Sequence, residues 1–196
     1  MEFQDVVRKR RMVRNFADQP IDPAVIDRIV ELTRHAPSAG FTQGQSFIIV
    51  TDLQMKKAIA ATCEEEEYVK SGFAPFVSQA PVLLIPCTSE AAYHRRYQEA
   101  DKVNADGLEI EWPVPYWFMD IGCAVMIALL AAIDEGLVAA FAGSKDLSTF
   151  RALLHMPLEV TPVGVIALGY RAADMPSPSL KRGRKPDAEY VHRERW

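Results

Sequence analysis

The segment "FMDIGCAVMIALLAAID", Phe118 to Asp134, decides the fold because it is the most apolar stretch of the chain. One acidic residue, Asp120, stands near its start, and Gly136 supplies a helix terminator just beyond its end. The stretch falls short of the roughly 20 apolar residues that a membrane span needs. It therefore predicts a long buried core helix in a soluble protein rather than a transmembrane segment.

Shorter apolar runs on both sides of this helix predict a sheet. Runs bounded by Pro, Gly or Asp predict helices between the strands, such as the one that begins at Asp22-Pro23, with Asp as N-cap and Pro in the first turn. The expected strands are "SFIIVT" (46–51), "APVLLIPC" (80–87), "LVAAFAG" (137–143) and "VGVIALGY" (163–170), and the expected helices cover 3–11, 22–35, 52–59 and 147–154. This alternation predicts an α/β or α+β sheet with helices on its faces.

Size and composition fit one domain over residues 1–196. A net charge of −4 argues against a general nucleic-acid binder. Three cysteines without a Cys-x-x-Cys pair and four scattered histidines give no disulfide framework and no metal site. The N-terminus lacks the apolar core of a signal peptide, so we expect a cytoplasmic protein that binds neither membrane nor nucleic acid.

The run "VRKRRMVRNF" (7–16) holds five of the 22 Lys and Arg residues of the chain. In a helix over 3–11, Arg10 lies on the same face as Phe3 and Val7 and should point inward. An inward arginine needs an anion, because a buried unpaired charge is costly. Arg10 and Arg14 converging on a phosphate is one interpretation. In the other interpretation, Arg10 pairs with an internal carboxylate and its basic neighbours form a solvated face.

Three further segments are candidates for function. The loop "APSAGFTQGQ" (36–45) has small residues that let a flat ligand approach the backbone, although it also suits an ordinary connection. Residues 90–117 are polar and aromatic and predict an insertion or lid. The "EEEE" run (64–67) predicts a solvated face. The charged, proline-rich arm 172–196 ends the chain, and its basic cluster 181–186 is either a solvated tail or a built anion site.

Several common catalytic signatures are absent from the chain. There is no Gly-x-Gly-x-x-Gly after a strand, no Walker A sequence and no Gly-x-Ser-x-Gly elbow. A Rossmann dehydrogenase, a P-loop enzyme and an α/β-hydrolase are therefore disfavoured.

Three of these segments, in this order, resemble the FMN-dependent nitroreductase family. The family's Arg-Arg-Ser-x-Arg-x-Phe motif is matched by residues 10–16, "RRMVRNF". Its Ala-Pro-Ser-x-x-Asn-x-Gln-Pro-Trp motif is matched by residues 36–45, and its closing basic segment by residues 182–186. The resemblance spans nearly the whole chain, and the last core strand, "TPVGVIALGYR", also takes part in it.

The resemblance implies an α+β, three-layer fold with a central mixed sheet, and an intertwined homodimer that holds FMN at its interface. The implied FMN contacts are Arg10, Arg11, Met12 and Arg14 at the phosphate and ribityl chain, Arg182 and Arg184 completing the phosphate site, Pro37, Ser38, Ala39 and Gln43 from the partner subunit, and Ala142 and Gly143 beside the isoalloxazine ring. The long apolar helix would form much of the dimer interface, and the arm 172–196 would wrap around the partner subunit.

The activity that the resemblance implies is ping-pong hydride transfer from NADH or NADPH, through flavin N5, to an electron-poor nitroaromatic, quinone or activated alkene. No dedicated side-chain acid or nucleophile is needed. Flat acceptors stack on aromatic rings, so the expected substrate pocket contains Phe41, Trp112, Tyr116 and Trp117, with Tyr93 and Tyr97 as further candidates. Trp112 and Trp117 have an alternative role, which is to seat the 90–117 segment on the core.

The chain also departs from the family pattern. Met12 replaces the usual Ser, Phe41 replaces Asn, and Gly44-Gln45 replaces Pro-Trp. These changes leave the arginines expected to bind the phosphate in place. They alter residues expected to contact the nicotinamide and the substrate. They leave open a specialised relative, of the reductive dehalogenase or flavin-fragmenting type, and a non-catalytic flavin-binding protein.

Overall fold

The computed structural model describes residues 1–196 and contains eight α-helices, two short 3-10 helices and five strands. In chain order these are α1 (Phe3–Lys9), α2 (Pro23–Thr33), η1 (Ala39–Phe41), β1 (Gln45–Val50), α3 (Leu53–Thr62), α4 (Glu65–Lys70), β2 (Val82–Thr88), α5 (Glu90–Tyr97), α6 (Tyr116–Asp134), β3 (Val138–Ala142), α7 (Leu147–Leu153), β4 (Thr161–Pro162), β5 (Val165–Gly169), η2 (Pro178–Arg182) and α8 (Asp187–Tyr190).

The strands form one sheet in the order β1-β2-β5-β3, and two-residue β4 pairs with β2. Every pair of named strands is antiparallel, for example Ile48 opposite Ile85 and Leu84 opposite Ile166. The parallel component is an isolated bridge between Met12 and Ala139, on the outer edge of β3. Of the two fold classes that the sequence allows, the structure has α+β.

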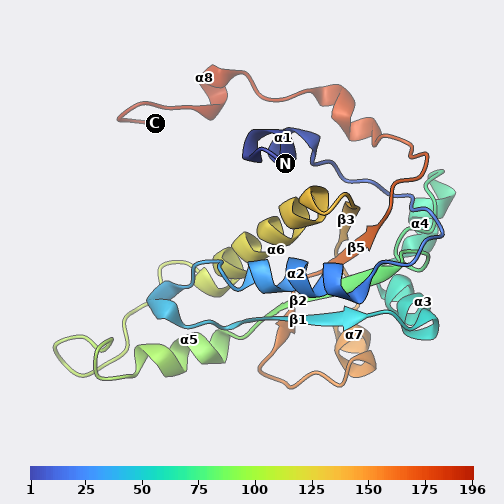
Figure 1. Ribbon diagram of the computed structural model, residues 1–196. Coiled ribbons are helices and arrows are strands. Elements are labelled where there is room, and N and C mark those ends of the chain that lie inside the picture. The colour runs from blue at the N-terminus through green and yellow to red at the C-terminus, as the bar shows by residue number, and fades with distance from the viewer.

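Both faces of the sheet are buried, so β2 and β5 are apolar on successive residues. Leu83, Ile85 and Ala167 face a core shared with α3 and α7. Leu84 and Ile166, one residue away, face a second core shared with α2 and α6. Figure 1 shows α2 and α6 on one side of the sheet and α3 and α7 on the other, which is the expected three-layer arrangement.

The helix signals in the sequence hold in the structure. The Asp22 side chain caps α2 by accepting a hydrogen bond from Ala24 N at 2.9 Å, and Asp52 caps α3 through Met55 N at 2.8 Å. Helix α6 begins two residues before the expected start and ends at Asp134, followed by Gly136 with φ of 78°. By length and apolar composition α6 could cross a membrane, but half of it is buried inside the protein.

Two expectations about local structure are wrong. Helix α1 ends at Lys9, and Phe3 and Val7 are 71% and 45% exposed, so Arg10 does not continue an inward helical stripe. Arg10 adopts φ of −59° and ψ of 123° and begins an extended segment instead. The acidic run 64–67 is not uniformly solvated either, because Glu65 is buried. Its carboxylate has three donors, which compensate for the loss of water.

Candidate functional site

The basic segment lies on the open edge of the sheet, next to β3. Val13 N donates to Ala139 O at 2.9 Å, and Phe16 forms an antiparallel bridge with Arg171 beyond the end of β5. Two main-chain contacts at well-separated points fix residues 12–16 against the core. The same edge strand ends at the predicted flavin-binding residues Ala142, which is buried, and Gly143, which is exposed.

The arginines of this segment have no acidic partner. Arg10, Arg11 and Arg14 form no ion pair, although Arg10 and Arg14 are half-buried. The Nε atom of Arg14 is buried without a hydrogen-bond partner. The interpretation in which Arg10 pairs with an internal carboxylate is therefore wrong. A buried unpartnered guanidinium N–H is the feature expected of a site that binds an anion.

The second basic cluster stands apart from the first in this single chain. Arg182, at the end of η2, and Arg184 are exposed, and their side chains make no hydrogen bond or ion pair. Figure 1 shows the arm arching over α1 and ending at a distance from the sheet. The structure thus brings Arg10–Arg14 beside β3, but it does not bring Arg182 and Arg184 to them.

The predicted loop at Pro37–Gln43 is a compact structure with its own internal bonds. Ser38 Oγ accepts a hydrogen bond from Gln43 N at 2.9 Å. Gly40, Phe41 and Gln43 have φ of 62°, 54° and 55°, in the left-handed region. This backbone turns the Phe41 side chain outward, where it is 77% exposed.

Asp120 anchors this loop to the apolar helix. Its Oδ2 accepts hydrogen bonds from Ala39 N and from Tyr93 Oη, both at 2.8 Å. Burial, together with the bond to the Asp120 carboxylate, raises the pKa of the Tyr93 hydroxyl, so Tyr93 remains a neutral donor. Asp120 and its role were not predicted, although one carboxylate in an otherwise apolar helix was a signal that could have found it.

Helix α5 closes over the same loop from the other side. Arg96 Nε donates to Gly40 O at 3.0 Å. The Tyr97 ring lies so close that a Cβ on Gly40 would come within 2.7 Å of it. Gly40 is required here both by its positive φ and by this contact. The 90–117 segment is therefore in direct contact with the predicted flavin loop.

The aromatic residues of the 90–117 segment form one cluster centred on Trp112. Its ring lies 4.5 Å from that of Tyr97 and 5.8 Å from that of Trp117, centroid to centroid. Trp117 is buried, whereas Trp112 and Tyr116 are half-buried. This packing supports the alternative in which Trp112 and Trp117 seat the segment on the core, and it leaves exposed Phe41 as the accessible ring of the predicted pocket.

A contact between His94 and Glu109 joins α5 to the second half of the 90–117 segment. His94 Nδ1 lies 2.5 Å from Glu109 Oε1, which also accepts from Trp112 Nε1 at 2.6 Å. Glu90 Oε1 lies 3.5 Å from His94 Nε2. The hydrogen bond to Glu109 raises the pKa of His94, and Glu90 adds to the effect. Protonated His94 therefore binds both carboxylates.

Comparison with known proteins agrees with this fold. A family model described as the nitroreductase family matches residues 7–170. The chain belongs to the nitroreductase family.

Three relatives extend across most of the chain. A protein of Methanothermobacter thermautotrophicus assigned as an NADH dehydrogenase/NAD(P)H nitroreductase is 26% identical, over 100% of this chain and 88% of its own. Iodotyrosine deiodinase of Haliscomenobacter hydrossis is 27% identical, over 97% and 89%. FMN reductase [NAD(P)H] of Bacillus subtilis is 28% identical, over 95% and 71%.

Solved structures confirm the fold. NfrA1 of B. megaterium superimposes with a TM-score of 0.80 at 22% identity, covering 100% of this chain and 75% of that one. The nitroreductase family protein from Streptococcus pneumoniae gives a TM-score of 0.77 at 20% identity, with coverage of 98% and 100%.

Replacing Asp120 tests the anchor of the loop. In Asp120→Ala, buried Tyr93 Oη and half-buried Ala39 N both lose their acceptor, so we expect the free energy of unfolding in urea to fall by about 2–4 kcal/mol. Hydrogen exchange at the Ala39 amide should rise in the same variant. Tyr93→Phe is the matched control, because it removes the second donor and keeps the bond to Ala39. Unchanged exchange at Ala39 in Asp120→Ala would contradict the assignment.

The His94 contact predicts a pH-dependent stability. Because the folded-state pKa of His94 is raised above its ordinary value of 6.5, its stabilisation is fully present below that pH and is lost as pH rises through the folded pKa. The stability difference between wild type and His94→Gln should therefore be largest near pH 5.5 and smaller near about pH 9. Urea unfolding of both proteins across this range measures it, and a difference that grows with pH would contradict the pairing.

Proposed function

We propose that this protein is an FMN-dependent oxidoreductase that uses NADH or NADPH as electron donor. Membership of the family and the FMN reductase [NAD(P)H] relative support this function. The observation that carries it is the row of half-buried arginines without acidic partners, with Arg14 Nε buried and unpaired. A phosphate monoester such as that of FMN is the ligand whose charge and oxygen acceptors suit such a row.

The residues present fit this cofactor. Arg10, Arg11 and Arg14, with the Met12 main chain, would bind the phosphate and ribityl chain. Met12 contributes no hydroxyl, so the anchor rests on guanidinium groups and backbone. Arg182 and Arg184 would complete the phosphate site.

The other predicted contacts lie toward the ring system. The residues that would lie near the isoalloxazine are Ala142 and Gly143 at the end of β3 and, from the partner subunit, Pro37, Ser38, Ala39 and Gln43. Bound FMN would accept a hydride at N5 from NADH or NADPH and reduce an electron-poor nitroaromatic, quinone or activated alkene.

The chain's own part in the reaction is binding and orientation. The Asp120–Ala39 bond holds the loop at a fixed position, and α5 packs against Gly40. Exposed Phe41 offers an aromatic face on which a flat acceptor could stack. Residues 90–117 act as a cover for this region, and Trp112, Tyr116 and Trp117 hold the cover to the core.

A reductive dehalogenase is the second candidate, and a specific observation favours it. Iodotyrosine deiodinase of H. hydrossis matches 97% of this chain, and that of Nematostella vectensis matches 92% at 25% identity. Both activities use the same flavin site and differ in the acceptor. Halide release from an iodinated phenol under anaerobic reduction, compared with reduction of a nitroaromatic, distinguishes them.

We further propose a homodimer, because α6 leaves an apolar face uncovered. Phe118, Met119 and Met126 on this helix are 48%, 56% and 45% exposed. Gly122 and Cys123 lie between them on the same exposed face, and α1 adds exposed Phe3 and Val7 beside it. Exposed apolar surface of this kind marks an interface, and a second copy is the commonest occupant. The arm 172–196 would then reach over the partner and bring Arg182 and Arg184 to a phosphate.

The three cysteines are free thiols, which suits the reducing cytoplasm that we propose as the location.

Flavin binding tests the function directly. The purified protein should take up FMN, show flavin absorption, and be bleached by NADH or NADPH without oxygen. Arg10→Ala and Arg184→Ala should each raise the FMN dissociation constant by about 10- to 100-fold, since each loses a charge-assisted bond. Exposed Arg8→Ala is the matched control and should bind like wild type. A protein that takes up no FMN, or a flavin that neither nicotinamide reduces, would refute the proposal.

Introducing a charged side chain on the exposed face of α6 tests the proposed homodimer. Met126→Asp would bury a carboxylate in an apolar interface, so we expect dimer dissociation to be favoured by about 100-fold or more, with a monomer in size-exclusion chromatography with light scattering. Leu53→Asp, an equally exposed apolar residue on α3 across the sheet, should remain dimeric. If Met126→Asp remains dimeric, α6 does not form the dimer interface.

A further inference from the structure

Arg14 is held by aromatic rings instead of by a carboxylate. Its guanidinium carbon lies 5.2 Å from the centroid of the Phe73 ring and 5.9 Å from that of Phe76. A cation over the face of an aromatic ring is attracted by the ring quadrupole. The backbone N–H of Arg14 donates to Asp174 Oδ1 at 3.1 Å, so that carboxylate contacts the main chain of Arg14, and the guanidinium has no acidic group bound to it.

The rings themselves are fixed by further aromatic contacts. The Tyr68 ring meets Phe76 edge to face at 5.2 Å and meets Phe73 at 6.3 Å. Phe76 is buried in the core with α3, and Phe73 is half-buried between the core and Arg14. The three rings of Tyr68, Phe73 and Phe76 form what we call the aromatic platform.

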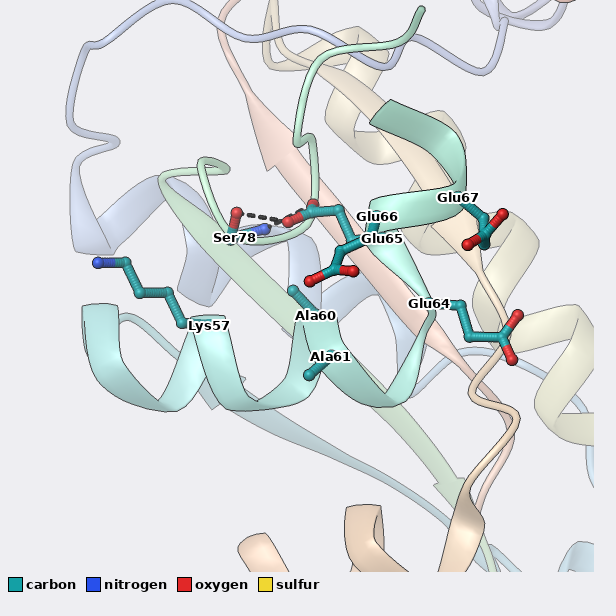
Figure 2. A pocket seen from close by; sticks show the side chains of 8 residues that line it. All are labelled: Lys57, Ala60, Ala61, Glu64, Glu65, Glu66, Glu67 and Ser78. Carbon is teal, nitrogen blue, oxygen red and sulfur yellow. Dashed lines mark hydrogen bonds between the residues drawn. The ribbon is translucent and has the colours of Figure 1, made fainter. Parts of the chain in front are cut away.

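A buried carboxylate fixes the loop that carries the platform. Glu65, at the start of α4, accepts hydrogen bonds from Val77 N at 2.5 Å, Ser78 N at 3.0 Å and Ser78 Oγ at 2.5 Å. Figure 2 shows Glu65 bonded to Ser78, with Glu64 and Glu67 turned away. The acidic run therefore includes one residue that holds the chain directly after Phe76 in place.

A platform of rings has a consequence that an ion pair would not have. A carboxylate would neutralise Arg14 and occupy its N–H donors, whereas a ring face leaves both the charge and the donors available. No hydrogen bond or ion pair within the protein occupies the Arg14 guanidinium, and its Nε is buried without a partner. Such a residue is oriented before any ligand arrives, so less rotamer entropy is lost on binding.

We propose that Phe73, backed by Tyr68 and Phe76, is a positioning residue that holds the Arg14 guanidinium uncompensated and oriented toward bound FMN. Phe73 acts through Arg14 and need not touch the cofactor. This inference rests on the proposed FMN-dependent function and adds to it a residue outside the motifs that resemble the family.

A double-mutant cycle on FMN affinity tests the inference, using fluorescence titration of the full-length protein. Phe73→Leu should raise the FMN dissociation constant by about 3- to 30-fold, the range expected for loss of a cation–π contact. Phe73→Tyr keeps a ring face and should bind within about twofold of wild type. In an Arg14→Met background, Phe73→Leu should change the dissociation constant by less than about twofold, because the group it positions is gone.

The outcomes separate this inference from the proposed function. If wild type binds FMN and Phe73→Leu binds equally well, or weakens binding as much with Met at position 14 as with Arg, Phe73 has a packing role only and the inference is overturned. If wild type itself takes up no FMN, the proposed function fails first. Urea unfolding of each variant checks folding, and Phe73→Met, closer in volume to Phe, replaces Phe73→Leu in the cycle should Leu not fold.

Discussion

The helix α6 is apolar around most of its circumference, and the rest of the structure depends on covering it. One side packs on the sheet and α2, which buries Ala128, Leu129 and Ala132 in the core. The sheet, buried by α6 on one face, needs α3 and α7 on the other, because apolar strands cannot leave either face to water. The opposite side of α6 carries Met119 and Met126 and remains exposed in one chain. The same helix thus shapes the core and carries the exposed apolar face on which the proposed homodimer rests.

The candidate site is built where these layers end. The basic segment has no helix to hold it and instead takes up main-chain positions along β3 and past β5, through Val13 and Phe16. The loop Pro37–Gln43 is held by Asp120, the one carboxylate buried within α6. Arg14 is held by aromatic rings, and its buried Nε has no hydrogen-bond partner. No carboxylate forms an ion pair with Arg10, Arg11 or Arg14, so the positive charge of the basic segment is not neutralised by the protein.

The fold was largely predictable from the sequence because it rests on local patterns. Caps such as Asp22 and Asp52, and apolar runs such as residues 82–85, mark elements without reference to distant residues. What failed was an inference about helical phase at Arg10, since α1 ends at Lys9 and Phe3 and Val7 lie outward. The contacts of Glu65 and Phe73 could not be derived either, because each joins segments whose proximity is created only by the tertiary fold. Charge composition shows that Glu65 is acidic but not that loop 77–78 will place three donors around it.

The pairing of Val13 with Ala139, and of Phe16 with Arg171, joins segments that are more than a hundred residues apart in the sequence. Closing a loop of this length costs chain entropy that only an already formed sheet can offset. The edge of β3 must therefore exist before the N-terminal segment can settle on it, and contacts of such sequence separation form slowly. The basic segment can therefore take its native position only after residues 139 and 171, its two main-chain partners, have been synthesised.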